Sequence, residues 1–219
     1  MASLRILIAA GMAVTLLAMA GCGGQKPKPA AATTVSFNLS YNKYSASNER
    51  LGETAFEDGL QLLFRVIPGA ILGKPPEAIL VTENPHDGQL HLTLPANAER
   101  YAQPLQAESL VVTPADTKVV RLASYHSYPH YSEPAGSGGF VDRNSGNPLV
   151  LVYFSQPVTI SGILELDQQT LVHELEIPSA GWHWLELVSD QPEQVVIKRY
   201  FGREADIEFR IIAENIISL

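Results

Sequence analysis

The sequence has little charge and a single cysteine. Charged residues make up 17% of the 219 residues, and the formal net charge is −8 because Asp and Glu outnumber Lys and Arg by 23 to 15. An acidic chain lacks the basic surface that releases counterions from polyphosphates, so we predict no nucleic-acid partner. One cysteine excludes an internal disulfide, a CxxC redox pair and a thiolate metal cage. Apolar residues reach 46%, which is enough for a hydrophobic core.

Motifs of the common enzyme classes are also missing. The chain contains no GxSxG, GxGxxG or P-loop pattern. We therefore predict no catalytic residue and no cofactor, with an envelope hydrolase that lacks a recognisable motif as one alternative. Glu174 and Glu176 would project from one strand face about 6–7 Å apart, a spacing that a glycosidase could use. An amphipathic strand turns the same two residues toward water, and we favour that interpretation.

The first 22 residues have the anatomy of a secretory signal. Arg5 is followed by an uncharged segment, residues 6–20, and then by small residues. Fifteen residues are too few to span a bilayer, which needs about 20. The letters LLAMAGC, residues 16–22, resemble the lipobox of bacterial lipoproteins, although Met19 stands where that family usually has Leu.

The lipoprotein resemblance covers residues 1–22 only and implies a membrane partner. It makes residues 1–21 a signal peptide and Cys22 the site of lipidation, with residues 22–34 as the lipidated cysteine and a flexible Gly- and Pro-containing tether. Two or three buried acyl chains anchor a domain stably. Gly23, in place of the Asp that marks inner-membrane retention, implies the outer membrane, with the domain facing the periplasm. A cut after the alternative A-x-A site, residues 18–20, would instead release a soluble protein with a free thiol.

A period-two alternation of apolar and polar residues recurs along the rest of the chain. Such alternation is typical of strands with one buried face, and turn clusters rich in Pro, Asp, Asn and Gly separate the runs. The predicted strands are 35–41, 60–67, 78–82, 89–94, 109–113, 118–124, 148–155, 158–166, 171–177, 182–188, 194–201 and 207–213. A dozen short strands predict an all-β fold, specifically an antiparallel β-sandwich of the immunoglobulin-like or transthyretin-like type.

One long segment, residues 125–147, breaks the alternation. We predict an N-terminal β region at 35–135, a loop or linker at 136–147 and a C-terminal β region at 148–219. These regions form either one domain with a long loop or two small β subdomains. Residues 142–147 begin like a calcium loop but lack its later carboxylate, so a turn closed by Asx hydrogen bonds is favoured.

This irregular segment also holds the predicted binding residues. They are Tyr125, His126, Tyr128, His130 and Tyr131, with Phe140 nearby and small polar residues between them. Tyrosine beside Ser and Gly is typical of adaptable recognition surfaces. We interpret the segment as a surface for an envelope protein or a glycan, with a linker that binds nothing as the alternative.

Histidines suggest a metal only weakly. His126 and His130 have helical spacing, but Pro129 would break the helix, and zinc would still need a third ligand such as Glu133 or Asp142. We predict no metal site, and a metal-handling periplasmic lipoprotein stays as an alternative function.

A second pair of histidines is expected to be structural. If the strands 171–177 and 182–188 form a hairpin, His173 and His183 lie about 13 Å apart and cannot share an ion. Trp182 and Trp184 share the opposite strand face, where a sheet-packing role is favoured over a ligand platform. The function predicted from the sequence is therefore a lipid-anchored cell-envelope protein that binds or scaffolds an envelope protein or glycan.

Overall fold

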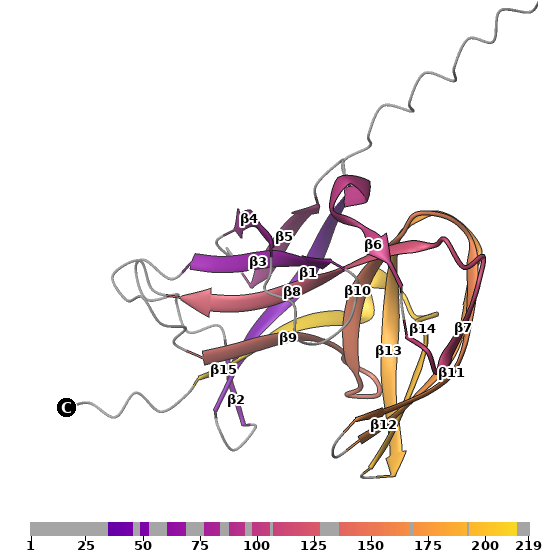
Figure 1. Cartoon of the computed structure of the whole chain (residues 1–219). Helices are drawn as coiled ribbons and strands as arrows, with labels where there is room; N and C mark the ends of the chain where they lie inside the picture. Colours follow the sequence, from indigo (N-terminus) through magenta and orange to yellow (C-terminus); the bar gives the residue numbers. More distant parts are fainter. Residues whose placement is uncertain are drawn as a thin grey trace, which may run out of the picture. The chain divides into compact units, whose positions relative to one another are not determined.

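Strands dominate the part of the chain that the structure, a computed structural model, describes (Figure 1). That part comprises residues 35–45, 49–52, 61–68, 77–83, 88–94, 98–105, 107–127, 136–166, 169–191 and 193–213. The predicted signal peptide, Cys22 and the predicted tether lie outside it. None of the described helices is long and apolar enough to cross a membrane.

All twelve strands predicted from alternation are present, with ends that shift by a few residues. They are β1 (Val35–Tyr44), β3 (Gln61–Pro68), β4 (Glu77–Glu83), β5 (Gln89–Leu94), β7 (Leu110–Thr113), β8 (Lys118–Ser127), β10 (Pro148–Phe154), β11 (Val158–Leu166), β12 (Gln169–Ile177), β13 (Gly181–Gln191), β14 (Gln194–Arg199) and β15 (Ile207–Ala213). The elements that the sequence did not predict are β2 (Arg50–Gly52), β6 (Gln103–Pro104), β9 (Gly136–Asp142) and the 3-10 turn η2 (Glu204–Asp206). The other 3-10 turn, η1 (Ala98–Tyr101), lies within residues 96–102, where the sequence indicates a helical turn. The all-β class is therefore confirmed.

Hydrogen bonds connect the described strands into one mixed sheet. Its longest path runs β2-β1-β15-β9-β8-β10-β13-β14-β12-β11-β7, with β3, β4, β5 and β6 joined at the side. Most pairs are antiparallel, but β1 pairs with β15 and β12 pairs with β14 in parallel. The prediction of a purely antiparallel arrangement is wrong at these two pairs. Parallel neighbours need a long connection, and a pattern of alternation carries no information about strand direction.

Strand β9 corrects the prediction that residues 136–147 form a loop or linker. Residues 136–142 pair along their whole length with β15, and Phe140 lies opposite Phe209. A Cβ atom at Gly138 would lie 2.8 Å from Cζ of Phe209, so only glycine lets that ring pack across the strand. Gly138 is thus required by a core contact, whereas Gly139 has open space beside it.

The predicted hairpin between residues 171–177 and 182–188 is also wrong. Strand β14 lies between β12 and β13, so His173 is opposite Ile197 and Gly162, whereas His183 is opposite Val152. Residues 178–180 connect β12 to β13, and three residues suffice to pass over one intervening strand at about 4.8 Å per strand spacing.

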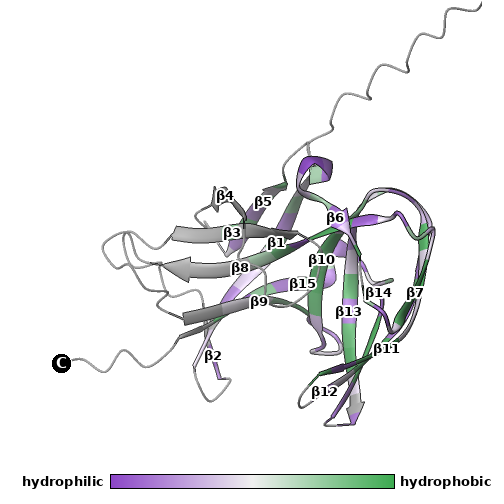
Figure 2. Ribbon diagram, in the orientation of Figure 1, coloured by the Kyte–Doolittle hydropathy of each residue, from purple (hydrophilic) through white to green (hydrophobic). Residues whose placement is uncertain are grey.

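Two apolar clusters lie on opposite faces of the same central strands. In β10 the residues Leu149 and Leu151 belong to the first cluster, and Val152 and Phe154 belong to the second. This double burial explains why β10, PLVLVYF, is almost continuously apolar (Figure 2). The first cluster also takes residues from β1, β3, β5, β8, β9 and β15, and the second takes residues from β8, β11, β12 and β13.

Strands from both predicted β regions pair with each other. β1 lies beside β15, and β8 lies beside β10. The division of the chain into two small β subdomains is not decided by these pairings and stays a prediction.

Candidate functional site

A cleft of about 190 Å³ opens beside the end of β14. It is lined by Phe37, Trp182, His183, Trp184, Arg199, Tyr200, Gly202, Glu204 and Ile207. Four of these nine residues are Phe, Trp or Tyr. Three others, His183, Arg199 and Glu204, carry ionisable or charged groups. The lining residues come from β1, β13, β14, β15 and the connection between β14 and β15.

The cleft exists because β13 continues beyond its partner β14. Within the described residues, pairing between these strands begins at Leu185 opposite Arg199. The backbone N–H of Tyr200 still donates to the carbonyl of Trp184 at 2.9 Å, and the chain then turns away toward η2. No residue of β14 covers Gly181, Trp182 or His183, so this end of β13 forms a wall that is open on one side.

Tryptophans form that wall and also pack on the core. The ring of Trp184 meets Phe37 edge-on at 5.5 Å between centroids and Phe140 at 4.9 Å, while Trp182 meets Tyr153 at 5.7 Å. Both indoles are half-buried against the first apolar cluster. The predicted sheet-packing role is therefore confirmed, and the same rings contribute to the cleft. The indole N–H of Trp184 is buried without a hydrogen-bond partner among the described residues.

The hydroxyl group of Tyr200 is held by a hydrogen bond and by close packing. Its hydroxyl donates to Oδ1 of Asp142 at 3.2 Å. Burial and the charge of Asp142 raise the pKa of Tyr200 to about 12, so the phenol stays protonated at neutral pH. At Gly202 a Cβ atom would lie 2.1 Å from the Tyr200 hydroxyl oxygen, so glycine is needed where the chain folds back over the ring.

Asp142 organises the turn that supports Tyr200. Its carboxylate accepts the backbone N–H groups of Asn144 and Ser145, both at 3.2 Å, and the hydroxyl of Ser145 at 2.8 Å. The predicted Asx hydrogen bonds are thus confirmed. Burial alone would raise the pKa of Asp142, but the hydrogen bonds from Ser145, Asn144 and Tyr200 outweigh burial and lower this pKa below its ordinary value.

Three polar side chains complete the cleft. His183 donates a ring N–H to the carbonyl of Ser179 at 2.9 Å, and burial lowers its pKa, so it is neutral at neutral pH. Glu204 accepts the backbone N–H of Asn38 at 3.0 Å. Arg199 places its guanidinium over the ring of Phe201, 5.1 Å from the centroid, and makes no ion pair with any described residue.

None of the predicted binding residues is among the described residues that line this cleft. Tyr125 and His126 lie in β8, which extends further than predicted, and the structure describes their backbone only. Tyr128, His130 and Tyr131 lie outside the described residues, as does Glu133. These interpretations stay predictions. Phe140, however, is not on a loop: it is 4% exposed and stacks on Phe64 in the core.

The other candidates take the positions expected of structural residues. Glu174 and Glu176 are exposed on β12, between buried Leu175 and Ile177, as an amphipathic strand requires. Burial lowers the pKa of His173. In the part of the chain that the structure describes, no three His, Cys, Asp or Glu residues are grouped closely enough to hold a metal ion.

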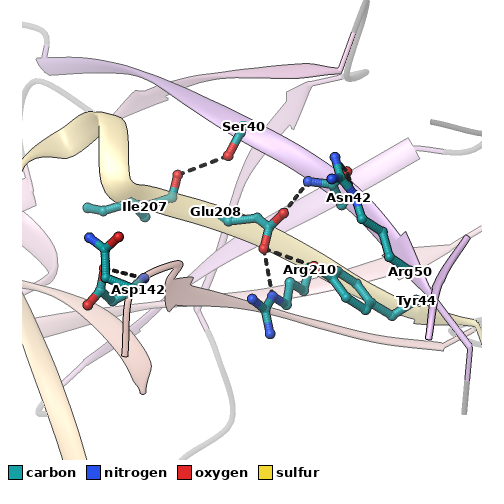
Figure 3. Close-up of polar contacts among 9 residues, drawn as sticks. Ser40, Asn42, Tyr44, Arg50, Asp142, Ile207, Glu208 and Arg210 are labelled. Atoms are coloured by element: carbon teal, nitrogen blue, oxygen red, sulfur yellow. Dashed lines mark hydrogen bonds and ion pairs between the residues drawn. The ribbon is translucent and has the colours of Figure 1, made fainter. Parts of the chain in front are cut away.

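A second polar cluster surrounds Glu208, which is 3% exposed (Figure 3). Its carboxylate accepts the side-chain amide of Asn42, the hydroxyl of Tyr44 at 3.2 Å and Nε of Arg210 at 2.7 Å. The guanidinium of Arg210 lies 4.7 Å from the centroid of the Tyr44 ring. Burial and the Glu208 charge raise the pKa of Tyr44. This group joins β1 to β15.

Arg50 closes the Glu208 cluster. It donates to Oδ1 of Asn42 from Nε at 2.8 Å and from Nη2 at 2.6 Å, which orients the amide so that its NH₂ group faces Glu208. Every charged group of this cluster therefore has a partner. Such an arrangement fixes the parallel pair β1–β15.

Comparisons with family models, curated proteins and solved structures found no match. The chemistry of the cleft must therefore be argued from its own residues. Aromatic walls with a few convergent polar groups are the usual composition of a small-ligand site. Sequence analysis interpreted Trp182, Trp184 and His183 as structural residues. It did not consider Phe37, Arg199, Tyr200 and Glu204, which also line the cleft. The available signal was the run RYFGRE, residues 199–204, in which two aromatic and three charged residues cover the end of the predicted strand 194–201 and the connection that follows it.

Proposed function

We propose that this protein is a lipid-anchored binding protein of the bacterial cell envelope, and that its cleft binds one sugar ring of an envelope glycan. The single observation that carries the glycan assignment is the cleft, where Trp182, Trp184 and Tyr200 meet the polar side chains of His183, Arg199 and Glu204. Aromatic faces suit the apolar C–H face of a pyranose ring, and charged or imidazole groups suit its hydroxyls.

The size of the cleft supports a sugar ring rather than a larger ligand or a flat protein surface. Its volume of about 190 Å³ is below the range of roughly 300–1,000 Å³ that drug-sized ligands occupy. A stable protein interface takes about 800 Å² from each partner, which a narrow cleft does not provide. A polymer that inserts one unit and leaves the remainder outside matches these dimensions.

Membrane attachment is the second half of the proposal. The lipobox-like residues 16–22 support acylation of Cys22, and the tether that follows would hold the domain near the membrane. We propose the outer membrane, with the domain facing the periplasm. Intact-mass measurement tests the anchor: the mature protein should begin at Cys22 and carry acyl chains, and Cys22→Ser should move the protein to the aqueous phase of a detergent partition. An unmodified chain in the aqueous phase would contradict it.

The finer description of the fold belongs to the same proposal. We propose a β-sandwich of the immunoglobulin-like or transthyretin-like type. The alternation of exposed and buried residues in β5 supports it, because sandwich strands bury one face. An experimental structure tests it: two packed sheets about 10 Å apart are expected, and a sheet that does not fold onto a second layer would contradict it.

The glycan assignment can be tested by intrinsic fluorescence, because the only two tryptophans in the sequence both line the cleft. Titration with a β-linked N-acetylglucosamine tetramer should change the emission in a saturable manner. Trp182→Ala should abolish saccharide binding. Calorimetric titration measures this loss, because the heat of binding does not depend on the fluorophore.

Tyr101→Ala provides the matched control. Tyr101 packs on the same apolar cluster but does not line the cleft. It should lower the melting temperature and leave saccharide binding intact. Saturable binding that survives Trp182→Ala, or no binding of any oligosaccharide by the wild type, would overturn the proposed glycan site.

A further inference from the structure

Arg199 differs from three other arginine and lysine side chains near it. Lys198 pairs with Glu186 at 3.7 Å, and Arg203 pairs with Asp206 at 2.9 Å from Nε, with a second bond from Nη2. Arg210 pairs with Glu208 at 2.7 Å. Among the described residues, Arg199 has no carboxylate partner, although it is half-buried. A cation that is partly withdrawn from water without a counter-charge favours an anionic neighbour.

Because Arg199 lines the cleft, an anion that pairs with it would bind there. Its guanidinium belongs to the cleft lining and lies against the ring of Phe201, which is 81% exposed. Stacking on an aromatic ring holds a guanidinium in a defined plane. A planar guanidinium can donate two parallel hydrogen bonds to a carboxylate, which a lysine cannot do. Phe201 thus restricts the group that would meet the ligand.

The other ionisable groups that line the cleft are less suited than Arg199 to pair with an anionic ligand. Glu204 is the one lining carboxylate, and the backbone N–H of Asn38 already binds it. His183 directs a ring N–H to Ser179 and carries no charge at neutral pH, because burial lowers its pKa. Among the described lining residues, Arg199 is therefore the one cation without a carboxylate partner, and the one carboxylate, that of Glu204, is already hydrogen-bonded.

Resting on the proposed glycan function, we infer that the cleft selects saccharides that carry a carboxylate, and that Arg199 binds this carboxylate as a bidentate pair while the aromatic wall holds the ring. The ligand class is therefore an acidic saccharide rather than a neutral one. Arg199 would be the residue that determines specificity.

Two disaccharides that differ in one carboxylate test the inference. The probes are N,N′-diacetylchitobiose, which is neutral, and N-acetylglucosaminyl-N-acetylmuramic acid, which carries a lactyl carboxylate. Calorimetric titration of the full chain at low salt should give about tenfold tighter binding of the acidic probe. This preference should fall as salt is added, since exposed charges are screened.

Arg199→Gln should reduce the preference to about onefold, because it should weaken binding of the acidic probe more than binding of the neutral probe. Arg199→Lys should retain part of it through the point charge alone. Lys198→Gln is the matched control, because Lys198 is the next residue of β14, does not line the cleft and should leave the preference intact. Near-ultraviolet circular dichroism of each variant establishes that it is folded.

The outcomes separate this inference from the proposed function. Equal affinity of the wild type for both probes, or a preference that persists in Arg199→Gln, overturns the carboxylate inference and leaves glycan binding standing. No binding of either probe by the wild type contradicts both.

Discussion

The cluster around Glu208 and the cleft beside Arg199 use the same residue types in opposite ways. At Glu208 a buried carboxylate meets Asn42, Tyr44 and Arg210, and each charged group has a partner within the protein. At the cleft the guanidinium of Arg199 lies over the ring of Phe201 and has no carboxylate partner among the described residues. Paired charges fix neighbouring strands, whereas a charge without a partner in the fold contributes little to stability and is free for recognition. Substitutions in the two regions should therefore have opposite effects on stability and binding.

The largest expected effect is at Glu208. Glu208→Ala leaves Arg210 and Asn42 without their acceptor in a buried position, and we expect the free energy of unfolding to fall by about 3 kcal/mol. Urea denaturation measures this change. Glu176→Ala, an exposed residue of β12, is the control and should change the free energy by less than about 0.5 kcal/mol. Similar losses of unfolding free energy in both variants would show that the paired charges around Glu208 do not contribute specially to stability.

Gly202→Ala should cause the second-largest loss of unfolding free energy. The new methyl group would meet the Tyr200 hydroxyl, which cannot move freely because it is bonded to Asp142. We expect a loss of about 2 kcal/mol in unfolding free energy and weaker saccharide binding, since Tyr200 lines the cleft. Gly139→Ala is a useful contrast, because a Cβ atom there has no heavy atom within 4 Å. Unchanged stability and binding in Gly202→Ala would show that the cleft wall is more adaptable than proposed.

Asp142→Asn should reveal a pH dependence. The lowered pKa of Asp142 means that its charged form stabilises the folded state above the ordinary Asp value of about 3.9, and that this contribution is lost as pH falls through the lower folded-state pKa. The variant should cost about 1–2 kcal/mol at pH 7. Measured from pH 7 to pH 2, the difference between wild type and variant should shrink toward zero at the acidic end. A constant difference across that range would contradict the assignment.

The smallest expected effect on stability is at Arg199. Arg199→Gln removes only a cation–π contact with an exposed ring, so the free energy of unfolding should change by less than about 1 kcal/mol. Binding of the acidic disaccharide should nevertheless weaken about tenfold. Thermal denaturation and calorimetric titration on the same samples measure both quantities. A large stability loss with unchanged binding would reverse the comparison between the two regions.

Alternation in the sequence predicted the strands well because a half-buried strand must alternate. It succeeded even for β10, whose continuous apolar run is the consequence of burial on both faces. Strand β9 was not predicted, because Gly138 is required by the ring of Phe209, a residue 71 positions away. Local composition cannot show that contact. Pairing partners were harder to predict: nothing near His173 indicates that β14 would lie between β12 and β13.

The cleft was only partly predictable for a similar reason. Trp182 and Trp184 drew notice as large apolar residues, but Phe37 and Glu204 become their neighbours only through the pairing of β1 with β15. Arg199 could be recognised as important only by seeing which cations have partners. A sequence shows charges but not which of them are neutralised.

The parallel pairing of β1 with β15 has a consequence for biogenesis. Asn42 and Glu208 are 166 positions apart, so the first strand cannot find its neighbour until nearly all of the intervening chain is available. Contacts of such long sequence separation form slowly. The β1–β15 pair therefore forms only after nearly the whole chain has been made, whereas β1 can pair earlier with β2 and β5.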